Sequence, residues 1–172
     1  TGDRFRQDED GFLYITGRIK DYFKTIQGKF VAPTPIEAQF ADNPYVEQQC
    51  LVGLGMNKTI MVAVVSETMR DAPRDVIEAS VLETVEQLNG VVEKHARMGG
   101  VILTYEPWSI ENGVLTPTLK IKRDQISDRF GEEASAMAPV YRAIPGLGAL
   151  STCHDSSTDV VSHLIIRELG RG

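Results

Sequence analysis

The stretch from residue 46 to residue 105 constrains the fold most, because strand patterns flank one long helical pattern. Two runs of β-forming residues, 46–54 and 59–66, are separated by glycines and an Asn-Lys pair, which predicts an antiparallel pair of strands. A third such run covers residues 101–105. Between them the apolar positions recur every three or four residues, as on one face of a helix: Ile77, Val81, Val85, Leu88 and Val92. The order strand–strand–helix–strand predicts an α+β unit with a mixed or antiparallel sheet.

The first forty residues predict smaller elements. Residues 12–16 follow an Asp-Gly turn and indicate a short strand. Residues 21–31 alternate aromatic and polar side chains around Gly28, which predicts a hairpin with a tight turn at that glycine. Pro33 then begins a helix, since proline is tolerated in a first turn.

The later part of the chain is divided by composition. We expect the long helix to end at Gly99-Gly100, and residues 117–130 to form a loop that leads into a helix. Residues 131–155 are rich in Gly, Ala, Pro and Ser and are typical of a linker. Residues 158–169 predict one more amphipathic helix. The predicted fold is therefore a small α+β domain in which helices pack on a β-hairpin and a three-stranded mixed sheet.

Composition excludes several classes of protein. The 172 residues contain 18 Lys and Arg against 24 Asp and Glu, and the net charge of −6 argues against a general nucleic-acid binder. The apolar runs are all much shorter than the ~20 residues of a membrane-spanning helix. Cys50 and Cys153 cannot make a disulfide framework, which favours a reducing compartment. The histidines are scattered, and Cys153 beside His154 is poor ligand geometry, so we expect no metal site.

Basic residues nevertheless gather in two short stretches, 18–29 and 120–129. They are either solvated surface or two parts of one anion site.

Some residues suggest chemistry by their type and position. Asp3 and Arg18 flank the first strand, and an aspartate and an arginine can bind the hydroxyls and phosphate of a nucleotide. Gly28, at a hairpin tip, lets the backbone approach a ligand closely. Lys120 follows a polar loop, from which a compact cation can reach a developing negative charge. Each also has a purely structural explanation, as a turn acid, a strand-end arginine, a turn glycine or a solvated lysine.

The order and spacing of these features resemble the adenylate-forming enzymes, the AMP-binding superfamily that includes acyl-CoA synthetases, luciferases and nonribosomal-peptide adenylation domains. The run TGDRFRQDEDGFLYITGRIKDYFKTIQGKFVAPTPIE is similar to the junction between their large and small domains. The run NGVLTPTLKIKRDQI resembles the segment around their catalytic lysine, and its TPTLKIKR form looks most like that of long-chain fatty acyl-CoA synthetases. The resemblance covers about residues 1–130. It implies that residues 1–18 end a large N-terminal domain, that 19–130 form the mobile C-terminal domain, and that 131–172 are an extension.

The resemblance also implies a role for each residue that matches a family motif. Asp3 would bind the ribose hydroxyls of the adenylate, and Arg18 would contact the same nucleotide. Lys20 would be the hinge on which the small domain rotates.

The remaining matches concern the two basic stretches. Lys24 and Gly28 would face the nucleotide or the pantetheine channel when the thioester forms. Lys120 would be the catalytic residue, between the fatty carboxylate and the α-phosphate during adenylation.

The activity implied by the resemblance is that of a long-chain fatty acid–CoA ligase, which converts ATP, fatty acid and CoA to acyl-CoA, AMP and pyrophosphate. ATP or AMP, CoA and Mg²⁺ would serve the full-length enzyme, and this portion alone would be inactive. Its partners would be those small molecules and an N-terminal domain, with no nucleic acid. The expected location is the cytoplasm, with a peripheral contact at a membrane surface left open, as is the oligomeric state. One alternative is an adenylating enzyme that delivers to a carrier protein or a reductase, and another is a non-catalytic fragment that binds a partner.

Overall fold

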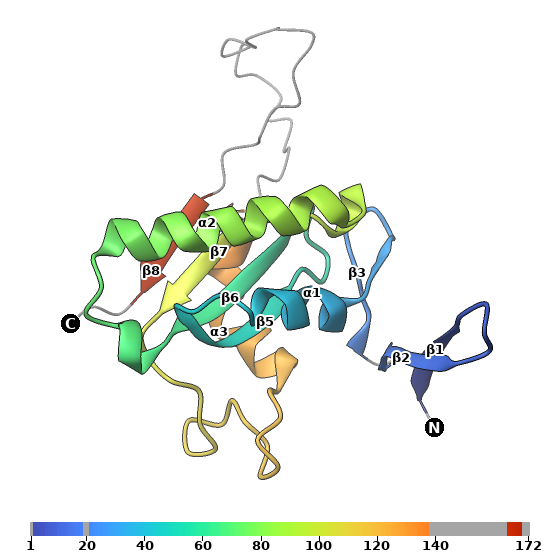
Figure 1. Ribbon diagram of the computed structural model, residues 1–172. Helices are drawn as coiled ribbons and strands as arrows, with labels where there is room; N and C mark the ends of the chain where they lie inside the picture. The colour runs from blue at the N-terminus through green and yellow to red at the C-terminus, as the bar shows by residue number, and fades with distance from the viewer. Residues whose placement is uncertain (1, 19–20, 138–164, 170–172) are drawn as a thin grey trace, which may run out of the picture.

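The sheet predicted from the strand patterns is present and mixed. The computed structural model describes residues 2–18, 21–137 and 165–169. Strand β5 (Val46–Val52) pairs antiparallel with β6 (Thr59–Val65), and β6 pairs parallel with β7 (Met98–Thr104). Helices α1 (Pro33–Phe40) and α2 (Arg74–Val91) cover one face of this sheet, while α3 (Arg123–Met137) covers the other (Figure 1). The α+β class is thus confirmed, and β5, β6 and β7 form the three mixed strands that were predicted, within a sheet of four strands.

Burial on both faces explains why β6 is apolar at every position after Thr59 rather than alternating. Every residue of Thr59–Val65 is buried. Met61, Ala63 and Val65 belong to the core under α1 and α2, whereas Val62 and Val64 belong to the core under α3. A strand covered by helices on both faces needs apolar side chains at odd and even positions alike.

Helix α2 buries the stripe that the sequence predicted: Ile77, Val81, Val85 and Leu88. The helix does not run to Gly99-Gly100, however, and that prediction is wrong. The backbone becomes extended at Val92, and both glycines lie inside β7. A Cβ atom on Gly99 would lie 2.9 Å from Cδ of Lys58, so the glycine leaves room for that side chain to cross the strand.

Two small hairpins precede the sheet. Strands β1 (Asp3–Gln7) and β2 (Leu13–Arg18) form the first, of which the sequence predicted only the second strand. This hairpin projects to one side of the domain, away from the sheet (Figure 1). Strands β3 (Phe23–Lys24) and β4 (Phe30–Val31) form the second, as predicted around Gly28.

The C-terminal predictions need two corrections. Helix α3 continues to Met137, so the first residues of the predicted linker are helical. Residues Ile165–Leu169 form strand β8, which pairs parallel with β7, so the helix prediction is wrong for them. The open edge of β7 offers backbone hydrogen bonds to this isoleucine-rich segment, and tertiary pairing of this kind overrides a weak local helix pattern.

Other expectations concern residues outside the described ranges: Lys20, the linker from 138 to 155, Cys153, His154, His163 and the helix over 158–164. Among the described residues, no helix is long and apolar enough to cross a membrane.

Candidate functional site

Lys120 lies on a tight hairpin whose backbone is closed by hydrogen bonds. Leu115 and Ile121 form an antiparallel bridge at its base. The Thr116 N–H donates to the carbonyl of Lys120 (2.8 Å), and the Lys120 N–H donates to the Thr116 side-chain hydroxyl (3.0 Å). Thr116 therefore fixes both backbone groups of Lys120, while the lysine side chain is exposed.

The residue before the lysine adopts an unusual backbone conformation. Leu119 has φ 57°, and among the described residues it is the one non-glycine residue with positive φ. A leucine in this region costs about 1–2 kcal/mol relative to glycine, because Cβ approaches the neighbouring carbonyl oxygen. The hairpin tolerates this cost because Leu119 N–H donates to the carbonyl of Thr116 (2.9 Å).

The loop before this hairpin is anchored in the core. Trp108 is buried, and its backbone N–H donates to Oε1 of Gln48 in β5 (2.7 Å). Asn112 closes a turn by accepting from the N–H of Ser109 (2.9 Å) and donating to the carbonyl of Pro107 (2.9 Å). Several backbone polar groups of this loop are thus paired within the chain.

The β3–β4 hairpin carries Lys24 and Gly28. Gly28 has φ 75°, which is the reason that a glycine fits this turn. The hairpin rests on the β5–β6 turn, where the Ile26 N–H donates to the carbonyl of Met56 (3.0 Å) and the Gly55 N–H donates to that of Lys24 (2.9 Å). The Lys24 ammonium nitrogen lies 4.7 Å from the centroid of the Phe30 ring, within the range of a cation–π contact.

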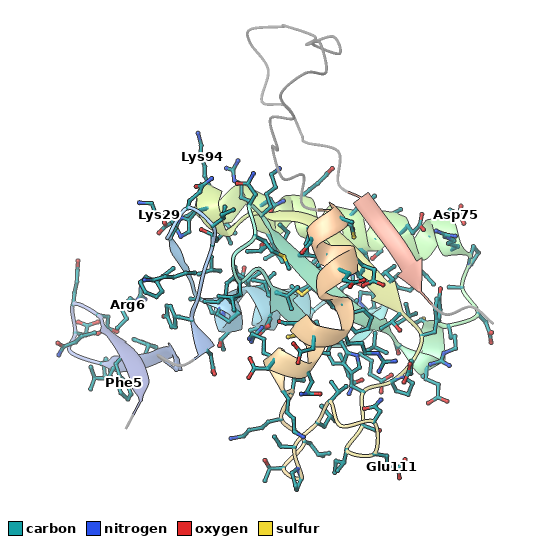
Figure 2. The ribbon with its side chains drawn as sticks, turned by 180° about the vertical axis from the view of Figure 1, so that it is seen from behind. Phe5, Arg6, Lys29, Asp75, Lys94 and Glu111 are labelled. Carbon is teal, nitrogen blue, oxygen red and sulfur yellow. The ribbon has the colours of Figure 1, made fainter. Side chains whose placement is uncertain are left out.

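A cleft of about 330 Å³ opens beside the β3–β4 hairpin. It is lined by Asp21, Tyr22, Phe23, Lys24, Phe30, Val52, Gly53, Leu54, Arg123, Asp124 and Ser127. Lys24 therefore lines this cleft, and Lys120 does not. Figure 2 shows Lys29 of the β3–β4 hairpin and Glu111 of the loop before Lys120 at well-separated points of the domain. The structure thus does not bring the two predicted lysines into one site.

Asp3 and Arg18, by contrast, come together in the backbone. They are directly opposite partners in the antiparallel β1–β2 ladder. Residues 15 apart in sequence thus meet at one end of this hairpin, a juxtaposition that the flanking positions around one predicted strand did not reveal.

Cys50 is a buried free cysteine. It lies in β5, and burial raises the pKa of its thiol to about 12, against the lowering influence of Arg123. A thiol with so high a pKa is a poor nucleophile at neutral pH.

Metal-binding groups do not assemble within the ranges that the structure describes: no three His, Cys, Asp or Glu side chains could hold an ion there.

The sequence reasoning missed three residues that shape the site. Thr116 fixes the backbone of Lys120, and Glu37 and Arg123 form a partly buried ion pair beneath the hairpin. The available signal for the ion pair was the presence of a charged residue in each helix, Glu37 in α1 and Arg123 at the start of α3. Their pairing across 86 positions could not be read from the sequence.

Comparison with known proteins identifies the family. Residues 20–140 match the model of the AMP-binding enzyme C-terminal domain, and the chain belongs to this family.

The relatives are adenylate-forming enzymes. Long chain acyl-CoA synthetase 6 of Arabidopsis thaliana is 32% identical over 170 residues, which cover 76% of this chain and 23% of that protein. The long-chain-fatty-acid–CoA ligase FadD15 of Mycobacterium tuberculosis is 31% identical over 157 residues, 80% of this chain and 26% of that protein. This chain thus spans about a quarter of the length of these relatives.

A solved structure shares the fold. The adenylation domain of a carboxylic acid reductase from Segniliparus rugosus, in complex with AMP and a co-purified carboxylic acid, superposes with a TM-score of 0.65 at 23% identity. The match covers 80% of this chain and 22% of that one.

Proposed function

We propose that this chain is the mobile C-terminal domain of a long-chain fatty acid–CoA ligase and that Lys120 is its catalytic lysine. The exposed amine of Lys120 on a hairpin of fixed backbone carries the proposal. A preorganised cation needs no rearrangement of its own backbone when negative charge develops beside it, so its electrostatic stabilisation is realised in the transition state. The family match and the acyl-CoA synthetase relatives support this reading.

In the first half-reaction, a fatty carboxylate oxygen attacks the α-phosphorus of ATP. The new C–O–P linkage forms as the bond to pyrophosphate breaks, which gives acyl-adenylate. Lys120 would lie between the carboxylate and the α-phosphate, where its charge offsets the repulsion between two anions and stabilises the oxygens as charge accumulates.

In the second half-reaction, the thiol of CoA loses its proton and attacks the acyl carbonyl carbon, and AMP leaves. We assign the β3–β4 hairpin, with Lys24 and Gly28, to this step. Gly28 has open space around its Cα, so a ligand can approach the backbone there. Lys20 is the proposed hinge on which the domain rotates between the two half-reactions.

The residues also bear on nucleotide and metal. The opposed backbone positions of Asp3 and Arg18 fit a ribose and a phosphate held side by side, which suits AMP or ATP. Where the chain is described, its carboxylates do not gather into a cage for Mg²⁺. We therefore assign this ion to the ATP that carries it and route no step through residues of this domain.

The test uses the full-length protein that contains this chain. Lys120→Ala should lower the rate of acyl-adenylate formation by about 10²–10³-fold, the cost of losing one preorganised donor. CoA transfer from synthetic acyl-adenylate should be largely retained. Lys122→Ala, which removes another exposed lysine of the same segment, is the matched control and should change neither rate. Equal loss of both half-reactions in Lys120→Ala would refute the assignment.

Delivery of the acyl group to an acceptor other than CoA is an alternative function. The structural match to a carboxylic acid reductase favours an acyl-adenylate enzyme that delivers to a reductase or a carrier protein. Offering the full-length protein free CoA and a phosphopantetheine-loaded carrier protein in parallel separates the two. Acyl transfer to the carrier alone would select the alternative.

A further inference from the structure

Glu37 and Arg123 form a two-pronged ion pair between α1 and the first residue of α3. Nη1 of Arg123 lies 2.6 Å from Oε1 of Glu37, and Nη2 lies 3.1 Å from Oε2. Parallel bonds of this kind fix both the distance and the plane of the two groups. The pair is partly buried, with side-chain exposures of 25% for Arg123 and 17% for Glu37.

The same pair also binds both backbone polar groups of one residue of β5, Leu51. The Leu51 N–H donates to Oε1 of Glu37 (2.7 Å), and the Leu51 carbonyl accepts from Nη1 of Arg123 (2.5 Å). Nη1 also lies 3.2 Å from the sulfur of Cys50. The guanidinium thus joins α3 to α1 and to β5, and both of its terminal nitrogens are occupied within the chain.

The charge on Arg123 persists despite its burial. Desolvation by itself lowers the pKa of the guanidinium, but the hydrogen bonds that it donates to Glu37 and its attraction to nearby acidic groups raise the pKa by more, so the net pKa lies above its ordinary value. Neutralising one member would leave the other as a partly buried charge without its partner, which is costly.

A short, closed segment connects this pair to Lys120. The Lys122 N–H donates to the carbonyl of Val114 (2.8 Å), and the Ile121 bridge to Leu115 lies next to it. Arg123 follows directly and begins α3. A shift at Arg123 is therefore transmitted to the base of the hairpin with no free backbone between them.

We propose that Glu37 and Arg123 are positioning residues that fix where the Lys120 hairpin stands on the domain. This inference rests on the proposed role of Lys120. The catalytic residue touches the reactants, whereas the ion pair acts through it. Arg123 also lines the cleft beside Lys24. We nevertheless expect the hairpin with Lys24 to keep its place without the pair, because its own backbone bonds to the β5–β6 turn hold it.

The experiment measures both half-reactions in the full-length protein for Arg123→Met, Arg123→Lys and Glu37→Gln. A displacement of about 1 Å can cost about 100-fold in rate. We therefore expect Arg123→Met to lower kcat of adenylation about 10- to 100-fold, with little change in KM for ATP and acid. CoA transfer from acyl-adenylate should be retained. Arg123→Lys should recover part of the rate, since it restores the charge but not the fork.

A matched control lies on the same helix. Arg129 pairs with Glu106 at the surface, so Arg129→Met also breaks an Arg–Glu pair of α3 without touching the sheet. It should leave both half-reactions unchanged. The double variant with Glu37→Gln and Arg123→Met should be no slower in adenylation than Arg123→Met alone, because the two residues act as one unit.

The outcomes separate the inference from the proposed function. If Lys120→Ala abolishes adenylation but Arg123→Met and Glu37→Gln do not slow it, the positioning role is wrong and the role of Lys120 stands. If Lys120→Ala has no effect, the proposed function fails first. If the Arg123 and Glu37 variants slow both half-reactions equally, the pair is only structural. If Arg123→Met does not fold, the same kcat and KM measurements on Arg123→Lys and Glu37→Gln test the positioning role. Both of these variants keep polar groups in place.

Discussion

The hairpin that carries Lys24 and the hairpin that carries Lys120 are attached to the same sheet by different kinds of contact. The first is held by backbone hydrogen bonds to the β5–β6 turn, and its turn uses Gly28 at positive φ. The second is also closed by backbone hydrogen bonds, but it adds polar side-chain contacts, namely the hydroxyl of Thr116 and the pair of Arg123 with Glu37 that follows it. Its turn uses Leu119 at positive φ, where a glycine would fit more easily.

The two kinds of contact predict which substitutions should disturb each hairpin. Backbone contacts depend on shape, so steric changes should disturb the Lys24 hairpin. Side-chain contacts depend on particular polar groups, so single polar substitutions should disturb the Lys120 hairpin. If each hairpin serves a different half-reaction, the two can be impaired separately.

The largest effect on the Lys24 side is expected for Gly53→Ala. A Cβ there would lie 2.8 Å from the ring carbon Cε2 of Phe23 and 3.1 Å from Cγ2 of Thr59, so the β3 strand must move. Overpacking of a buried site costs about 1–3 kcal/mol. Urea denaturation of the chain should show this loss, and amide exchange should increase at residues 23–31 but not at 114–122.

Gly90→Ala is the control for this change. Gly90 lies in α2 with nothing within 4 Å of its Cβ position, so the same substitution should raise the free energy of unfolding by about 0.5–1 kcal/mol. A Gly53→Ala variant as stable as the parent chain would contradict the close approach of Phe23.

High pH should lower the free energy of unfolding through Cys50, whose sulfur contacts Arg123. The folded state keeps the Cys50 thiol protonated, with a pKa of about 12 against an ordinary value of 9.0. The contribution of this thiol to stability is complete below pH 9 and is lost as pH rises from 9 towards 12, by about 1 kcal/mol at pH 10. Stability measured by urea denaturation between pH 8 and about 10.5 should fall less steeply in Cys50→Ala than in the parent chain. Equal slopes in the two proteins would show that Cys50 ionises as freely when folded as when unfolded.

A comparable effect is expected for Thr116→Val, which removes the hydroxyl that accepts from the Lys120 N–H. One such bond contributes about 0.5–1.5 kcal/mol, so adenylation by the full-length protein should fall by up to about tenfold, while CoA transfer stays unchanged. Thr116→Ser keeps the hydroxyl and should behave like the parent. Slower CoA transfer in Thr116→Val would break the separation between the two hairpins.

The smallest effect concerns the two turns themselves. Leu119→Asn should stabilise the chain by about 0.5 kcal/mol, because asparagine tolerates positive φ better than leucine does. Gly28→Ala should destabilise it by about 1 kcal/mol for the converse reason. Urea denaturation of the two variants measures both changes in the free energy of unfolding. A destabilised Leu119→Asn would show that the exposed leucine makes a stabilising contact that outweighs its backbone cost.

The helices α1 and α2, the strands β5, β6 and β7 and the hairpin around Gly28 could be predicted from local signals. The stripe of α2 and the proline at the start of α1 depend on residues close in sequence, so they can be recognised there. The error at Gly99-Gly100 has the opposite origin. Those glycines match a helix end locally, but both lie in β7, and at Gly99 the missing side chain leaves room for Lys58.

Local sequence signals were enough to predict the α+β class, the order of the elements from β5 to β7, the turn at Gly28 and a lysine after a polar loop. These depend on periodicity and on the conformational preferences of single residues, which are short-range properties. Three contacts became visible in the tertiary structure alone. Asp3 pairs with Arg18 in the β1–β2 ladder, Ile165–Leu169 pairs with β7, and Glu37 forms an ion pair with Arg123. Such contacts are set by how buried faces pack and by which partner satisfies a charge removed from water, and neither is encoded in any one segment.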